Sequence, residues 1–206
     1  MKPLCGRHVV AVAAIGLAAA ALAAGCGGRK VQRIDPNATV DLSGNWNDTD
    51  SRLVAEEMIG DCLGSPWLDR FVGDKGKNPT VIAGSIRNKS LEHIAVGTFL
   101  KDVERALVNS GDAQVVASAE ERGEVREERA DQRVNASPET LKRMGMEVGA
   151  DFMLLGEINQ IDDREGGEVV KYYQVDLSLV NVESNVKAWV GQKKIKKYIS
   201  RSRYKP

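Results

Sequence analysis

Histidine and cysteine are scarce in this chain, and their scarcity excludes much catalytic and metal chemistry. The 206 residues include two histidines and three cysteines. His93 is the single histidine after the N-terminal apolar segment, and without neighbouring cysteines it does not supply the ligand spacing of a zinc site. The sequence also lacks a Gly-x-Ser-x-Gly elbow, a P-loop and a dinucleotide-binding fingerprint. We therefore expect a non-enzymatic protein with no catalytic residue, no metal and no small-molecule substrate.

An excess of charge is also absent, which bears on the class of partner. The chain has 29 basic and 29 acidic residues. Loss of the first 25 residues would remove Lys2, Arg7 and no acid, leaving a net charge near −2. A nearly neutral chain does not favour nucleic acid as a partner.

The N-terminus is organised like a signal peptide that ends at a cysteine. Lys2 and Arg7 precede an apolar run from Val9 to Ala24. This run of about 16 residues has the length of a signal peptide and is shorter than the roughly 20 residues of a membrane span. An ordinary signal peptide with a chance cysteine, or a helical anchor, is the alternative interpretation.

Residues 22–26, Leu-Ala-Ala-Gly-Cys, resemble the lipobox of bacterial lipoproteins. The resemblance implies that residues 1–25 are removed and that Cys26 carries a covalent lipid, in place of any other cofactor. It also implies the periplasmic face of the outer membrane, since Gly27 follows the cysteine where aspartate would favour the inner membrane.

The remaining chain predicts one domain. Residues 26–42 are expected to form a lipidated linker that reaches at most about 55 Å. Residues 43–200 are expected to form the domain, and residues 201–206 a basic tail. Cys62 would have no disulfide partner and is expected to be an apolar core residue, with a reactive thiol as the alternative.

Hydrophobic periodicity predicts an α/β fold, a mixed, mostly antiparallel sheet flanked by helices. One helix is expected to begin after an N-cap at Asp48 or Thr49, and another to be capped by Thr98. Two more helices are expected from Trp67 and over residues 138–148. Expected strands cover residues 80–86, 114–117, 152–158, 173–179 and 186–190, the first buried on both faces and the third central.

Residues 120–133 are almost entirely charged. In a helix, no acid and base here would lie three or four positions apart, and four arginines would form one stripe, namely Arg122, Arg126, Arg129 and Arg133. Such rows of like charge oppose an isolated helix. We therefore expect partners outside the segment, either acids of the same domain or a docked protein.

Several segments resemble LpoB-type lipoproteins, in order along the chain: residues 41–51, 88–94, 110–111, 149–156, 173–179 and 189–197. The resemblance implies a fold like the N-terminal domain of TolB. It also implies an outer-membrane lipoprotein that activates a bifunctional penicillin-binding protein in peptidoglycan synthesis. The short linker departs from the long proline-rich linker of well-known members. An envelope-assembly or structural lipoprotein with another protein partner is the alternative function, and a wall-active enzyme is a third.

Polar residues that invite a functional interpretation also have structural ones. Helix capping accounts for Asp48 and Asp50 as well as a carboxylate pair does. Glu92 and His93 are interpreted as a loop-fixing hydrogen bond, with acid/base catalysis as the alternative. Lysines near the C-terminus predict either protection of an edge strand or docking to an acidic partner or anionic surface. The weak candidates for partner binding are Lys193, Lys194, Lys196 and Lys197.

Overall fold

The computed structural model of the chain describes residues 31–140 and 147–200. The chain divides into two units, residues 1–38 and 39–206. In the described part of the first unit, a turn closes where the carbonyl of Asp35 accepts the N–H of Ala38 at 3.0 Å.

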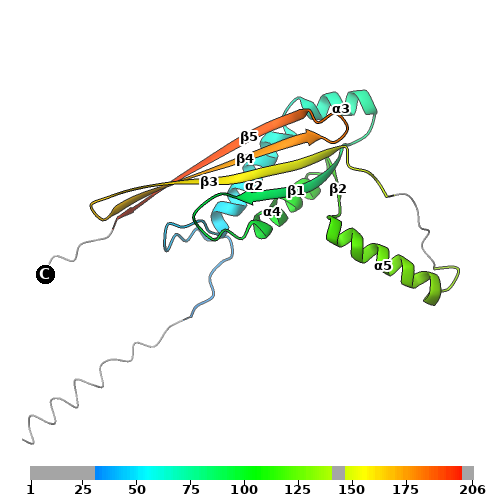
Figure 1. Cartoon of the computed structure of the whole chain (residues 1–206), viewed down its shortest axis with the longest axis horizontal. Coiled ribbons are helices and arrows are strands. Elements are labelled where there is room, and N and C mark those ends of the chain that lie inside the picture. Colours follow the sequence, from blue (N-terminus) through cyan, green and yellow to red (C-terminus); the bar gives the residue numbers. More distant parts are fainter. Residues whose placement is uncertain (1–30, 141–146, 201–206) are drawn as a thin grey trace, which may run out of the picture. The chain divides into compact units, whose positions relative to one another are not determined.

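The second unit is built on a five-stranded mixed sheet in the order β2-β1-β3-β4-β5 (Figure 1). The strands are β1 Thr80–Asn88, β2 Gln114–Val116, β3 Phe152–Glu165, β4 Glu168–Asn181 and β5 Lys187–Ser200. β1 is parallel to β2 and β3, whereas β4 is antiparallel to β3 and β5. The predicted α/β fold with a mixed sheet and a central third strand is therefore confirmed.

Helices cover one face of this sheet (Figure 1). The described residues form α2 Asp48–Leu63, α3 Trp67–Lys75, α4 Val96–Ser110 and α5 Ala119–Asn135. α2 packs on α4 and β5, and α4 packs on β1 and β2. The core between these layers contains large buried side chains from both, including Val54, Phe99, Leu107, Ile158 and Leu177.

The helix caps differ from those predicted. Asn47 is the N-cap of α2 and forms a capping box with Asp50, so the prediction of Asp48 or Thr49 was wrong by one or two residues. α4 begins at Val96 without a side-chain cap, so the predicted Thr98 cap was also wrong. Backbone carbonyls replace a side-chain cap here, since Ile94 accepts the N–H of Val96 at 2.9 Å and Ala95 accepts the N–H of Thr98 at 3.0 Å.

The strands extend further than the sequence pattern predicted. β3 and β4 pair as far as Glu165 and Glu168, and the turn between them is only Gly166 and Gly167, both at positive φ. Such a two-residue turn suits the twist of paired strands. β1 continues to Asn88 and is buried mainly on one face, so the expected break at residue 87 and burial on both faces were wrong.

The segment between α5 and β3 only partly tests the helix expected over residues 138–148. Residues 138–140 form a turn and residues 147–150 have no regular structure, so the expected ends of this helix were wrong. Residues 141–146, which carry Leu141 and Met144, lie outside the described residues.

Candidate functional site

Three of the segments singled out in the sequence, residues 41–51, 88–94 and 173–179, meet at the carboxylate of Glu92, in the loop between β1 and α4. Its oxygens accept the N–H of Trp46 at 3.0 Å and the hydroxyl of Tyr173 at 2.8 Å. Gln160 donates to it at 3.0 Å, and Lys171 forms an ion pair with it. The predicted loop-fixing role of Glu92 is thus confirmed, and its carboxylate is occupied by partners other than His93.

This Glu92 network is almost removed from water. The side chains of Lys171 and Glu92 are 11% and 14% exposed. Burial alone would raise the pKa of the Glu92 carboxyl, but hydrogen bonds from Lys171, Trp46 and Tyr173 outweigh it and lower the pKa. Burial, together with the adjacent Glu92 carboxylate, raises the pKa of Tyr173. The network therefore keeps a paired charge inside the domain, which supports a structural role for the Glu92 carboxylate.

A second polar cluster connects β5 to the start of α2. The ammonium of Lys197 lies 2.6 Å from Asp50 and 2.7 Å from Asp41. Burial works against its charge, but these two acids outweigh burial and raise the pKa of Lys197. Asp50 therefore serves the helix cap and this ion pair, which supports the structural interpretation of that carboxylate.

The four candidate lysines alternate between two faces of β5, an edge strand. Lys193 pairs with Glu57, and Lys197 is held by the acids described above. Lys194 and Lys196 are exposed, and neither forms an ion pair with a described residue. Of the four side chains, these two are therefore available to a partner.

Lys194 and Lys196 belong to the face of the sheet opposite α2 and α4. Strand register places Ile161, Tyr172 and Lys196 in one cross-strand row of that face, with Asn159, Gln174 and Lys194 in the next. We call the sheet surface the group formed by Ile161, Tyr172, Lys194, Lys196 and Tyr198. Ile161 and Tyr198 are 65% and 62% exposed. Exposed apolar side chains gathered in one patch are typical of interaction sites, and aromatic residues are enriched in protein interfaces.

Cys62 and all three tryptophans lie in the second unit, whereas Cys26 lies in the first. Cys26 lies outside the described residues. Cys62 is buried in α2, and burial raises the pKa of its thiol to about 12, as expected of an unreactive core residue. Trp67 and Trp189 are buried, and Trp46 packs against the core.

Metal binding and membrane insertion each require particular features of a chain. Residues 31–140 and 147–200 contain no cluster of three or more His, Cys, Asp or Glu side chains that could hold a metal ion. Among the helices of those same ranges, none has the length and apolar character required to cross a bilayer.

Sequence reasoning missed most partners of Glu92. Lys171 and Tyr173 follow it by 79 and 81 residues, and Gln160 by 68. One signal was present, since Lys171 is two residues before Tyr173 and so shares a strand face with the apolar residues of β4. A lysine in that row needs a buried acid as its partner.

The comparisons with known proteins extend over most of the folded unit. A family model for the peptidoglycan-synthase activator LpoB matches residues 50–195. The solved C-terminal domain of LpoB from Escherichia coli is 15% identical, with a TM-score of 0.44, and the match covers 72% of this chain and 99% of that one. Lipoprotein GNA1162 from Neisseria meningitidis is 17% identical, with a TM-score of 0.37 and coverage of 61% and 88%. No curated protein matches.

Proposed function

The chain belongs to the LpoB family of peptidoglycan-synthase activators, and from this premise we propose that it binds and activates a bifunctional penicillin-binding protein. The observation that carries the proposal is the family match over residues 50–195. This range includes the Glu92 loop and strands β1 to β4 in full. The partner and the activation itself are proposed, and the protein is taken to be a regulator without catalysis of its own.

The proposal places the protein at the periplasmic face of the outer membrane. Residues 1–25 act as the signal, Cys26 carries the lipid, residues 26–42 form the linker and residues 43–200 the binding domain. More than one acyl chain makes such an anchor stable, since a single chain holds only marginally. The linker reaches at most about 55 Å, so the synthase must extend from the inner membrane towards this domain.

The sheet surface is the proposed contact with the synthase. Lys194 and Lys196 are the cations on it that other described residues leave unpaired, and Ile161 and Tyr198 add exposed apolar area. An acidic and apolar patch on the synthase would complement this surface. Docking activates only if the domain binds the more active conformation of the synthase more tightly than the less active one.

A binding and activity experiment with one double variant tests this surface. The change K194E/K196E reverses both free charges and leaves the ion pairs of Lys193 and Lys197 in place. The full chain, purified in detergent, is mixed with a purified bifunctional synthase, and both affinity and glycan polymerisation are measured. We expect the double variant to bind at least tenfold more weakly, a change of about 1.4 kcal/mol or more.

The matched control reverses two exposed cations on α3, R70E/K75E, and is expected to leave affinity unchanged. If K194E/K196E binds and stimulates as the unaltered chain does, the sheet surface is not the contact. If the unaltered chain binds no synthase recovered from solubilised envelopes, the alternative of an envelope-assembly lipoprotein with another partner is favoured.

A further inference from the structure

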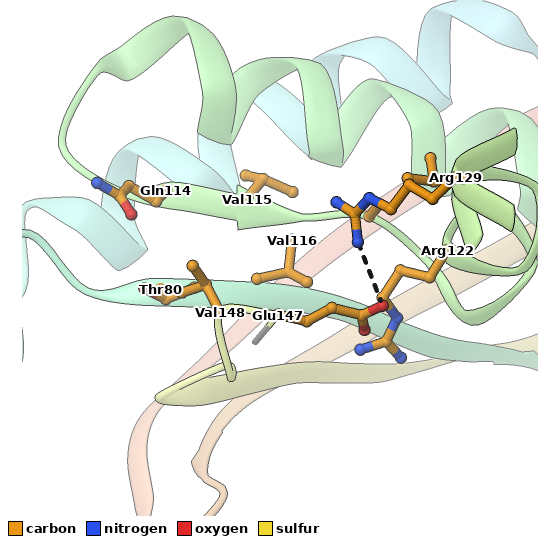
Figure 2. Close-up of a pocket in the computed structure, with 10 residues that line it drawn as sticks. Thr80, Gln114, Val115, Val116, Arg122, Arg129, Glu147 and Val148 are labelled. Atoms are coloured by element: carbon orange, nitrogen blue, oxygen red, sulfur yellow. Dashed lines mark ion pairs between the residues drawn. The ribbon is translucent and has the colours of Figure 1, made fainter. Parts of the chain in front are cut away.

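The other edge of the sheet carries a groove that the proposed function does not use. It lies between β2 and α5 and has a volume of about 350 Å³. Its lining combines apolar side chains with two arginines and one glutamate (Figure 2), namely Val115, Val116, Val125, Val148, Arg122, Arg129 and Glu147. β2 and β5 are at opposite ends of the strand order, so this groove is separate from the row of Lys194 and Lys196.

One wall of the groove is an unpaired strand edge. Gln114 donates its N–H to Pro79 at 2.9 Å, in a ladder parallel to β1. Alternate residues of a strand point their backbone groups to opposite sides, so the N–H and C=O of Val115 face away from β1. In the described part of the sheet, β2 pairs with β1 alone. The strand carries neither lysine nor proline, the residues that commonly protect an edge.

The other wall is the arginine stripe of α5, and Glu147 is the acidic residue that contacts this stripe. Arg126 binds the Glu147 carboxylate through two hydrogen bonds of 2.8 Å, and Arg129 lies 3.9 Å from it. Figure 2 shows Arg122 and Arg129 reaching towards Glu147 beside Val116. For Arg126 and Arg129, these contacts confirm the expectation of an acid of the same domain.

The single carboxylate of Glu147 does not neutralise the arginine stripe. Arg126 chiefly, and Arg122 and Arg129 more weakly, lower the pKa of Glu147, so three cations share one anion. Among the described residues, the Nε of Arg122 is buried without a hydrogen-bond partner. A guanidinium in this position is suited to a further carboxylate, which it binds in a planar, directional manner.

We propose that this groove binds an extended segment of a partner protein in which acidic side chains alternate with apolar ones. The segment would add a strand to the free edge at Val115, a known mode of peptide recognition. Its carboxylates would reach Arg122 and Arg129, and its apolar side chains would pack on Val125 and Val148, which are 44% and 61% exposed. Charge complementarity selects this occupant over a neutral or basic segment.

The segment would also stabilise α5. None of the residues of α5 is buried, and its like-charged side chains are spaced at three and four positions, which opposes a helix. Added carboxylates along the arginine stripe reduce that repulsion. Binding and helix stability are therefore coupled at this site.

The experiment titrates the full chain, in detergent, into a fluorescein-labelled eight-residue peptide in which valine alternates with aspartate. A matched peptide with asparagine in place of aspartate is the ligand control. We expect measurable binding of the acidic peptide and at least tenfold weaker binding of the neutral one. The amide of Val115 should exchange its hydrogen more slowly in the complex, because that N–H becomes part of a ladder.

Three variants separate strand addition from simple attraction of anions. R122Q/R129Q should weaken binding at least tenfold, while R164Q, at the distant hairpin, should not. Val115→Pro removes the outward N–H without breaking the pairing with β1, and it should also abolish binding. Glu147→Gln should strengthen binding, because it removes the internal competitor for the arginines.

The proposal is overturned if the acidic peptide does not bind, or if it binds R122Q/R129Q equally well with circular dichroism showing both chains folded. It is also overturned if Val115→Pro binds normally, or if inorganic phosphate displaces the peptide at equal concentration. The last result would mean a general anion site. None of these outcomes depends on stimulation of a synthase, so the two proposals fail independently.

Discussion

At the scale of single residues, Glu92 connects several segments of the domain through one carboxylate. It connects the segment before α2, through Trp46, with two positions of β4, Lys171 and Tyr173. Trp46 in turn packs edge-on against Tyr173 with ring centroids 5.6 Å apart. A single carboxylate thus fixes three segments that are far apart in the sequence.

Replacement of this carboxylate tests its structural role. Glu92→Gln retains the size of the side chain but leaves the Lys171 ammonium without its anion. We expect a loss of about 2–3 kcal/mol in the free energy of unfolding, because a nearly buried charge loses its partner. Urea unfolding measures it. Glu157→Gln, which removes an ion pair with Lys89 at the surface, is the control, and an equal loss in both variants would contradict the account.

The same carboxylate makes stability depend on pH. Because the pKa of Glu92 is lowered in the folded state, its contribution is complete above the unfolded value of about 4.3 and is lost as pH falls through the folded value. The stability difference between the unaltered chain and Glu92→Gln should therefore shrink below about pH 4. A difference that stays constant under acid, in unfolding curves recorded at successive pH values, would show that Glu92 is not ionised in the network.

At the scale of elements, the first turn of α2 depends on Asn47. Its side chain accepts the N–H of Asp50 at 3.1 Å, and the Asp50 carboxylate accepts the N–H of Asn47 at 3.0 Å. We expect Asn47→Ala to cost about 1 kcal/mol, the usual value of an N-cap. Thermal unfolding compares it with Asp48→Asn, which changes the helix start without touching the cap. A larger loss in Asp48→Asn would restore Asp48 as the residue that matters.

Two glycines in different elements should respond to alanine with opposite signs. A Cβ on Gly84 of β1 would lie 2.8 Å from the carbonyl oxygen of Leu154, whereas one on Gly60 of α2 would meet nothing within 4 Å. Gly84→Ala should therefore destabilise the domain by about 1–3 kcal/mol. Gly60→Ala should stabilise it by about 0.5–1 kcal/mol, since alanine favours a helix interior. Denaturant midpoints measure both changes in stability. Changes of the same sign in the two variants would contradict the packing described.

The elements also show what sequence periodicity can predict. Alternation in β4 predicted its buried row correctly, because Tyr173, Val175, Leu177 and Leu179 all face the helices. The pattern could not predict the ends of β3 and β4, because the side chains of β3 from Asp162 to Glu165 are polar and this part of the pair is held by backbone hydrogen bonds. The extent of a strand beyond the core follows from its partner, which the local sequence does not contain.

The candidate site was predictable to a smaller degree. Four lysines on an edge strand were expected, but their division into paired and free side chains depends on Glu57, Asp50 and Asp41, which precede β5 by more than a hundred positions. Likewise, the arginine stripe of α5 was visible in the sequence, whereas its groove requires the free edge of β2.

At the scale of the whole molecule, the account requires a lipid on Cys26. We expect Cys26→Ser to release the protein from the membrane fraction, because the acyl chains supply the binding energy of the anchor. Fractionation of envelopes, with mass spectrometry of the N-terminal peptide, measures this. Cys62→Ser is the control and should remain in the membrane fraction. A Cys26→Ser protein that still sediments with membranes would mean that another feature anchors it.

We propose that this folded unit raises the activity of a wall-building synthase by binding to it. The most direct test is glycan polymerisation by a purified bifunctional penicillin-binding protein, with and without the full chain at saturating concentration. We expect a faster rate with the chain present. At the lower concentration at which the unaltered chain half-saturates the synthase, K194E/K196E should leave the rate close to that of the synthase alone, because it binds at least tenfold more weakly. A rate unchanged by the unaltered chain, although the two proteins bind, would contradict it.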